Sequence, residues 1–153
     1  MILGLDPGRD KMGWALVPGG GELFFSGIVP VGDLCSFLTV FASPSSKWEE
    51  GVRRWICERL TGLPDGKTIE YVALGNGTGS RQTAERLAWL GLRTVLVDER
   101  NTTLAARDLY WRLHRPVLWQ RCLPRFLRLP PRVLDDMAAW AIALRGIEKF
   151  PRQ

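Results

Sequence analysis

The sequence contains little histidine and cysteine, which excludes several kinds of active site. Its 153 residues include one histidine, His114, and three widely spaced cysteines, Cys35, Cys57 and Cys122. A site that needs two histidines is therefore excluded, and no C-x-x-C pair indicates structural zinc. No nucleophile motif such as G-x-S-x-G is present. We expect the thiols to be buried and reduced, and any catalysis to depend on carboxylates.

Long hydrophobic runs are also missing. No stretch approaches the roughly 18 apolar residues of a membrane span, and the first residues lack the basic region of a signal peptide. We therefore expect a cytoplasmic protein without a membrane partner. Hydrophobic residues make up 46% of the chain and charged residues 24%. These values are typical of globular proteins, and the length predicts one domain over residues 1–153.

Acidic residues are absent between Asp108 and Asp135, where the cations of the sequence gather. Residues 1–99 hold ten Lys or Arg against twelve Asp or Glu, whereas residues 100–153 hold eleven against four. Arginine suits bidentate phosphate contacts, and the interleaved aromatic residues could stack on unpaired bases. The alternative is a solvated basic face with its aromatic side chains turned inward. We predict a nucleic-acid interface formed by Arg100, Arg112, Arg115, Arg121, Arg125, Arg128 and Arg132.

The pattern of apolar residues predicts an α/β fold. Three strands, over residues 2–5, 12–17 and 22–29, have short connections and indicate an antiparallel meander. Residues 33–41 suit either a helix or a loop. Beyond them we expect helices over 46–60, 80–90, 104–113 and 134–147, and strands over 69–74 and 93–97. Strands that alternate with helices after a meander predict a mixed, five-stranded sheet. The proline-broken segment before the last helix is expected to be irregular.

Carboxylates end two of the expected strands and open the last helix. Asp6 ends the first strand, Asp98 and Glu99 end the fifth, and Asp135 and Asp136 open the final helix. Acids also favour first helical turns and Pro-Gly turns for structural reasons. If they cluster, however, their oxygens would bind Mg²⁺ or Mn²⁺. A metal beside a basic surface indicates phosphodiester hydrolysis, with phosphate held by Arg100 or by the amides of residues 75–79.

Several motifs resemble those of the YqgF/RuvX family. Residues 2–13, ILGLDPGRDKMG, resemble its opening strand and turn, and residues 97–103, VDERNTT, resemble its D-E-R-x-[ST]-T motif. Residues 134–139, LDDMAA, resemble its closing acidic helix. Residues 73–78, ALGNGT, stand where the family has a fourth-strand loop. Together the motifs extend from residue 2 to about residue 144, and the D-E-R motif is the most specific of them.

The resemblance implies an RNase H-like fold and a bacterial nuclease that processes precursor 16S rRNA. Carried across by position, Asp6 matches the first catalytic acid and Asp135 the last. Related resolvases carry a Glu at the end of the fourth strand, where this chain has Gly75 and Asn76, so Asp98 or Glu99 must substitute. The implied catalytic set is Asp6, Asp98, Glu99 and Asp135. The implied metal ligands are Asp6, Glu99 and Asp135.

Other functions remain open from the sequence. The resemblance extends to Holliday-junction resolvases, which act on branched DNA. The Gly-Asn-Gly-Thr stretch also resembles YqgF-type domains in larger RNA-binding proteins, which favours a non-catalytic RNA-binding module. Actin-like ATPases share a first-strand D-x-G motif but need two such domains, and 153 residues supply one. The sequence does not determine whether the protein forms a homodimer.

Overall fold

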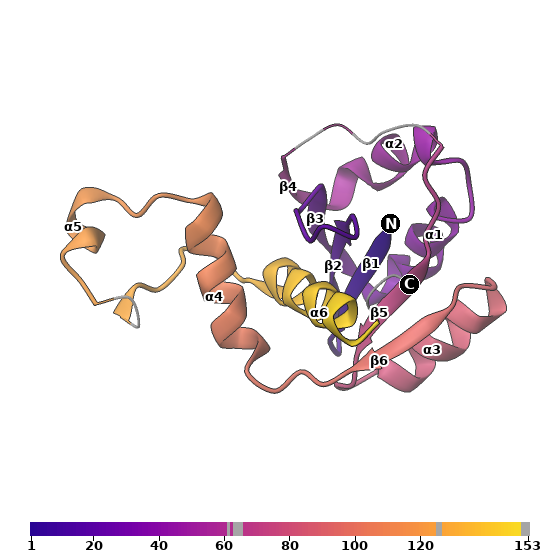
Figure 1. Ribbon diagram of the computed structural model, residues 1–153. Coiled ribbons are helices and arrows are strands. Elements are labelled where there is room, and N and C mark those ends of the chain that lie inside the picture. Colours follow the sequence, from indigo (N-terminus) through magenta and orange to yellow (C-terminus); the bar gives the residue numbers. More distant parts are fainter. Residues whose placement is uncertain (61, 63–65, 125–126, 151–153) are drawn as a thin grey trace.

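A mixed sheet forms the centre of the protein (Figure 1). The structure is a computed structural model that describes residues 1–60, 62, 66–124 and 127–150. Across the described residues the sheet has six strands in the order β4-β3-β2-β1-β5-β6. Strands β1, β2, β3 and β4 form successive antiparallel pairs. On the other side of β1, β5 pairs with β1 and β6 pairs with β5, both in parallel. The strands are β1 Ile2–Pro7, β2 Lys11–Val17, β3 Phe25–Pro30, β4 Ile56–Arg59, β5 Tyr71–Gly75 and β6 Thr94–Val97.

Helices cover both faces of the sheet. One face packs against α1 (Leu34–Val40), α2 (Trp48–Val52) and α3 (Ser80–Trp89). The other face packs against α4 (Thr102–Leu113) and α6 (Asp135–Lys149). Between α4 and α6 the chain leaves the body as a projecting segment, residues 114–134, which carries the short helix α5 (Leu118–Arg121) (Figure 1). In the described part of the chain, no helix has the length and apolarity to cross a membrane.

Alternation along β1 and β2 builds two separate cores, one on each face of the sheet. Leu3 and Leu5 belong to the core beneath α1, whereas Ile2 belongs to the core beneath α6. Because successive side chains of a strand point to opposite faces, Gly4 and Asp6 share the α6 face with Ile2. Asp6 is therefore the acid that ends an apolar strand on the face covered by α6.

Glycine allows α6 to lie directly on the sheet. A Cβ atom at Gly4 would overlap the carbonyl oxygen of Ala139, and one at Gly13 would overlap that of Asp135. Gly13 is also the antiparallel partner of Asp6 in the β1–β2 pair. The contact at Gly13 therefore brings the first turn of α6, with Asp135, beside the end of β1.

The expectation of five strands was wrong, because the helix expected over residues 46–60 ends early. Its apolar residues fit a helical stripe, but α2 ends at Val52, a 3₁₀ turn follows, and Ile56–Arg59 pairs with β3 as the edge strand β4. Burial alternates along this strand with period two. Gly51 weakens a continuous helix and leaves space for the side chain of Val40. Tertiary packing therefore favoured a strand over helical periodicity.

Other sequence expectations fared better. The α/β class, the antiparallel meander and the mixed sheet are confirmed, and residues 33–41 contain the helix α1. The third strand begins at Phe25 rather than at residue 22. The expectation of buried thiols was wrong, since Cys35, Cys57 and Cys122 are all free and exposed. None of the three cysteines belongs to an apolar core.

The contact of α6 with Gly13 leads to the first prediction. Gly13→Ala should lower the free energy of unfolding by about 1–3 kcal/mol, because the added methyl group must push α6 away from β2. Gly32→Ala is the matched control, since a Cβ atom there meets nothing within 4 Å. Urea unfolding of both variants provides the measurement. Equal stability of the two variants would contradict the close packing.

Candidate active site

Three of the carboxylates expected from the sequence line one cavity. Asp6 at the end of β1, Glu99 after β6 and Asp135 in the first turn of α6 all border a space of about 600 Å³. The N-terminal half of α4 and the end of the projecting segment complete its wall. Each acid comes from a different motif, so only the fold brings them together.

Asp6 is the acid most strongly affected by this environment. The pKa of Asp6 is raised from 3.8 to about 7, chiefly by burial and in addition by the neighbouring negative charges of Glu99 and Asp135. The effects of Glu99 and Asp135 on the pKa of Asp6 show that the three carboxylates interact electrostatically. A carboxyl group with a pKa near neutrality, in a cavity with two more acids, is typical of functional sites.

The carboxylate of Glu99 occupies space that is left open by two glycines, Gly75 and Gly77, at the end of β5. A Cβ atom at Gly75 or Gly77 would collide with the Glu99 carboxylate, which accepts a hydrogen bond of 3.0 Å from the Gly77 amide. The Glu99 amide donates to the side chain of Asn76, at 3.2 Å. The glycines at the end of β5 therefore make room for an acid that arrives from β6. The carboxylate of Glu99 takes the space that a side chain at position 75 would need.

The D-E-R-x-[ST]-T motif forms the turn that holds Glu99 in this position. Asn101 adopts a left-handed conformation with φ of 64°, and Thr102 then begins α4. The Thr102 hydroxyl and amide both donate to the Glu99 carbonyl oxygen, at 2.8 and 2.9 Å. The motif thus fixes the backbone on the C-terminal side of Glu99.

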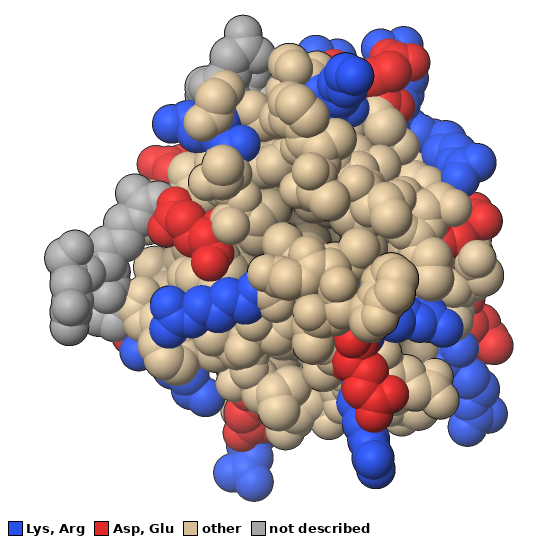
Figure 2. Space-filling view, turned by 90° about the vertical axis from the view of Figure 1, so that its right-hand side faces the viewer, with Lys and Arg blue, Asp and Glu red and all other residues tan. Residues whose placement is uncertain are grey.

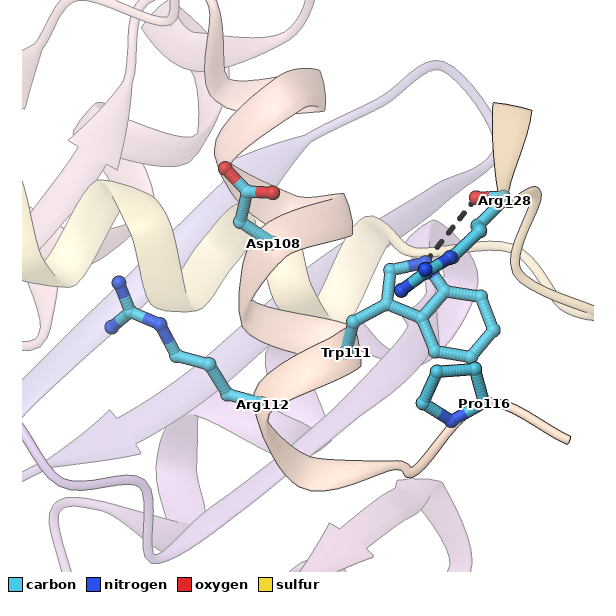
Figure 3. A pocket seen from close by; sticks show the side chains of 5 residues that line it. All are labelled: Asp108, Trp111, Arg112, Pro116 and Arg128. Atoms are coloured by element: carbon cyan, nitrogen blue, oxygen red, sulfur yellow. Dashed lines mark hydrogen bonds between the residues drawn. The ribbon is translucent and has the colours of Figure 1, made fainter. Parts of the chain in front are cut away.

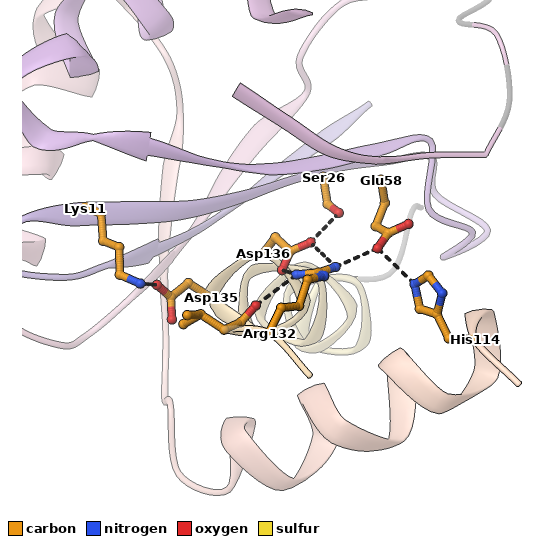
Figure 4. A network of polar contacts seen from close by, with 8 residues as sticks. Lys11, Ser26, Glu58, His114, Arg132, Asp135 and Asp136 are labelled. Atoms are coloured by element: carbon orange, nitrogen blue, oxygen red, sulfur yellow. Dashed lines mark hydrogen bonds and ion pairs between the residues drawn. The ribbon is translucent and has the colours of Figure 1, made fainter. Parts of the chain in front are cut away.

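Asp135 is the third acid, and a lysine partly neutralises it. The Lys11 ammonium group at the start of β2 lies 2.7 Å from its carboxylate (Figure 4). The sequence analysis missed Lys11. The available signal was the β1–β2 hairpin, because a turn of a few residues after Asp6 returns the chain to the same edge of the sheet.

The donor set fits a hard divalent cation in its chemistry. Three carboxylates in one cavity are oxygen ligands, and the raised pKa of Asp6 shows negative charge that no neighbour fully balances. As placed, however, no three of the described His, Cys, Asp and Glu side chains are close enough together to hold an ion. Lys11 holds Asp135, and the Gly77 amide holds Glu99. Both contacts must rearrange for three acids to share one cation.

Asp98 and Asp136 do not join the cavity. The exposed Asp98 side chain accepts a hydrogen bond from the Arg100 amide at 3.0 Å, which closes the turn after β6. Asp136 is fully buried and accepts from Ser26 at 2.9 Å. Of the paired acids in the sequence, the structure therefore directs Glu99 and Asp135 toward Asp6, and Asp98 and Asp136 away from it.

A charged network beneath the cavity neutralises Asp136 (Figure 4). The Arg132 guanidinium forms two bonds to Asp136, at 2.7 and 3.0 Å, and one to Glu58, at 2.6 Å. Burial alone would lower the pKa of Arg132, but its hydrogen bonds to Asp136 and Glu58 raise it above the usual value. His114 contacts the same Glu58 oxygen at 2.9 Å. The sequence analysis missed Glu58, because its inward orientation follows from the pairing of β4 with β3 and not from a local pattern.

The arginines expected to bind nucleic acid divide into two groups. Arg128 donates to the carbonyl groups of Leu123 and Arg121, and Arg121 donates to that of Pro116, so these two arginines shape the projecting segment. Arg132 belongs to the charged network. The second group consists of Arg100, Arg112 and Arg115, whose exposed side chains have no hydrogen-bond or ion-pair partner among the described residues. Arg125 lies outside the described residues.

A second cavity, of about 370 Å³, separates α4 from the projecting segment (Figure 3). Trp111 donates from its indole nitrogen to the Arg128 carbonyl oxygen at 3.2 Å, so this aromatic residue faces the segment. Tyr110 is buried in the core. Tyr110 and the half-buried Trp111 thus turn inward, as the alternative to a base-stacking surface requires, whereas the side chains of Trp119 and Phe126 lie outside the described residues. Exposed aliphatic side chains of the segment include Leu118, Leu127 and Leu129.

The surface charge differs between the two sides of the molecule. Figure 2 shows the side turned away from α5, where acidic and basic side chains both stand around a centre of other residues. The projecting segment, in contrast, has arginine and histidine but no acid before its end at residue 134. The projecting segment is therefore a stretch of uniformly positive charge that attracts polyanions.

Replacing Asp6 should stabilise the protein in a pH-dependent way. The raised pKa means that the folded state binds the Asp6 proton more tightly than the unfolded state, so ionisation costs stability as pH rises from about 4 to about 7. Asp6→Asn removes this cost and should raise the free energy of unfolding by about 2–4 kcal/mol at pH 8. The gain should shrink toward pH 4. Denaturant unfolding across this range, with Asp10→Asn as the exposed control in the same turn, provides the test; a gain independent of pH would refute it.

Removing Arg132 should have the opposite effect. Arg132→Met leaves Asp136 buried without its cation and should cost about 3–5 kcal/mol. Arg115→Met, at an exposed position, should change stability by no more than about 0.5 kcal/mol. Adding Asp136→Asn to Arg132→Met should restore part of the loss, because the buried charge is then gone. Thermal melts of the three variants measure this, and a stable Arg132→Met protein would show that the network is dispensable.

Compared with known protein families and with curated proteins, the chain matches neither a family nor an individual protein. The resemblance of its motifs therefore rests on the residues themselves. The first, D-E-R and closing-helix motifs each contribute one acid, and these acids, Asp6, Glu99 and Asp135, line a single cavity of an α/β fold.

Proposed function

We propose that the protein is a metal-dependent nuclease that hydrolyses phosphodiester bonds of structured nucleic acid. The observation that carries this proposal is the convergence of Asp6, Glu99 and Asp135 on one cavity, with mutual effects on the pKa of Asp6. Among nucleic acids, the motif resemblance favours the precursor of 16S rRNA, and thereby a role in ribosome biogenesis. The proposed metal is Mg²⁺ or Mn²⁺.

The fold is compatible with this proposal. Residues 1–153 would form a single RNase H-like domain. Such a fold has an antiparallel meander followed by parallel strands with intervening helices, and this order of elements occurs here. The edge strand β4 extends the meander on the side far from β5, so it leaves the end of β1 accessible. The acids stand at the carboxyl ends of β1 and β6 and on the adjacent α6, where α/β proteins bind ligands.

The chain's own residues would divide the work at this site. Asp6, Glu99 and Asp135 would hold the metal, which when bound supplies a more acidic water and a positive charge against the phosphate. Asp6 would bind that metal as a carboxylate, because a nearby cation lowers the pKa that burial, Glu99 and Asp135 raise in the metal-free protein. Arg107 of α4 lines the same cavity, has no ion-pair partner among the described residues, and can contact a phosphate oxygen.

Substrate binding would use the exposed arginines at both ends of α4. Arg112 and Arg115 lie at the end of α4 and the start of the projecting segment, and Arg100 stands in the turn after Glu99. All three are exposed, so a polyanion can reach them without disturbing the fold. Arg132 is left out of this set, because two carboxylates already hold its guanidinium group.

A non-catalytic RNA-binding module is the second candidate, and the Lys11–Asp135 ion pair favours it. The lysine supplies positive charge at one of the acids, so the acids of the cavity are partly neutralised without a metal ion. In that case the exposed arginines would bind RNA, and the three acids would have no catalytic use. Holliday-junction DNA is the other substrate that the motif resemblance supports.

Cleavage measured with and without metal separates these functions. We expect the wild-type protein to cut precursor 16S RNA only with Mg²⁺ or Mn²⁺. Asp6→Asn and Asp135→Asn should each reduce the rate about 100-fold or more, since each removes a charged ligand. Asp10→Asn should cut normally. Binding should persist in all three variants, because the arginines are unchanged.

The outcomes distinguish the candidates clearly. Binding without cleavage by the wild-type protein, with either metal, would establish the non-catalytic module. Cleavage of four-way DNA junctions but not of precursor RNA would show that the substrate is branched DNA. Metal-dependent cleavage that survives Asp6→Asn would show that the three acids are not the active site.

A further inference from the structure

A third cavity adjoins the carboxylate site on the other side of the turn after β1. It measures about 380 Å³ and lies between this turn, the start of α1 and the N-terminus of α3. Gly8 of its wall follows Asp6 by two residues, and Thr78 follows Gly77, whose amide holds Glu99. The two sites therefore share the loops after β1 and β5.

The rim of the cavity is strongly basic. Arg9 from the turn and Arg81 and Arg86 from α3 line it, together with Gln82 and Thr78. No acid is among its described lining residues. Arg81 is bound to Glu85 at 3.3 Å, whereas neither Arg9 nor Arg86 has an ion-pair partner in the described part of the chain. Two guanidinium groups are therefore available to an anion.

The N-terminus of α3 contributes backbone donors to the same space. This helix has ten residues and starts after Gly79, which has a left-handed backbone with φ of 86°. No side chain caps it. The amides of Arg81 and Gln82 form no hydrogen bond to any described residue. Free amides and the positive end of a helix dipole favour an anion at this point.

An independent sign of a ligand is the side chain of Thr83, which has no hydrogen-bond partner among the described residues. This side chain is only 3% exposed and lines the cavity on a floor that also contains Met12 and Leu34, each 1% exposed. Its amide bonds to the Gly79 carbonyl oxygen, whereas its hydroxyl group has no hydrogen bond to a described residue and is not among the polar atoms sealed from solvent. The hydroxyl is therefore free to donate a hydrogen bond to an anion in the cavity.

We propose that this cavity is a binding site for a phosphate group. The phosphate would accept hydrogen bonds from the Thr83 hydroxyl and the first amides of α3, and its charge would be balanced by Arg9 and Arg86. This assignment rests on the proposed function: the bound phosphate would belong to a nucleic-acid strand that continues from the carboxylate cavity across the turn after β1. The site would then set the position of that strand relative to Asp6.

Binding of inorganic phosphate, followed by calorimetry or ³¹P NMR without added metal, tests the site. Arg9→Gln and Arg86→Gln should each weaken binding roughly tenfold, because each removes a charge-assisted contact. Thr83→Val keeps the volume of the side chain and should weaken binding about three- to tenfold. Arg93→Gln is the matched control, since it makes the same charge change just before β6, at the end of the parallel strands far from the turn after β1. It should bind phosphate as the wild type does.

Absence of saturable binding, or equal binding by wild type and the Arg9→Gln/Arg86→Gln double variant, would overturn the proposal. Should Thr83→Val unfold, the two exposed or half-exposed arginines still decide the question. Oligonucleotides with and without a 5′-phosphate identify the source of the group. A preference for the 5′-phosphorylated strand that Arg86→Gln abolishes indicates a terminal phosphate, and equal affinity that Arg86→Gln lowers indicates a backbone phosphate.

The test is separate from that of the nuclease activity. Phosphate binding that is lost in Arg86→Gln but kept in Asp6→Asn supports the site even if the protein never cuts nucleic acid. Metal-dependent cleavage by a protein that binds no phosphate here would refute the site and leave the nuclease proposal intact.

Discussion

The direct contact between α6 and the backbone of β1 and β2 is the constraint on which the rest of the structure depends. Gly4 and Gly13 have no side chains to separate the helix from the sheet, and the alanines of α6 do the same from the other side. A bulkier residue at Gly13 would lift the first turn of the helix. Asp135 would then move away from Asp6, Asp136 would lose Ser26, and both the cavity and the charged network would change together.

Much of this arrangement was predictable from the sequence, and the remainder depended on contacts between distant residues. Asp6, Glu99 and Asp135 could be named because acids at strand ends and first helical turns are local patterns. The choice of Glu99 over Asp98 was not local, since it depends on the missing side chains of Gly75 and Gly77 in another loop. For a similar reason β4 was missed. Its residues fit a helical stripe, and only pairing with β3 decides in favour of a strand.

The two acids that open α6 show how position determines the use of identical side chains. Asp135 borders the cavity beside an exposed lysine, so its charge remains available to solvent and ligands. Asp136, one residue further, is completely buried, and Arg132 and Ser26 form hydrogen bonds to its carboxylate. One arginine of the basic stretch is thereby a structural cation. The count of positive charges in the sequence consequently overstates the charge that a nucleic acid would meet.

Glu58 joins the two ends of the projecting segment at a single oxygen atom. His114 binds it where the segment leaves α4, and Arg132 binds it shortly before the chain enters α6. The segment is thus a closed loop whose ends stay together whatever its length. Because the entropy of closing a loop grows only slowly with the number of residues in it, lengthening or shortening this segment changes the folding free energy little. Evolution can therefore alter the part that projects into solvent while the carboxylate cavity keeps its shape.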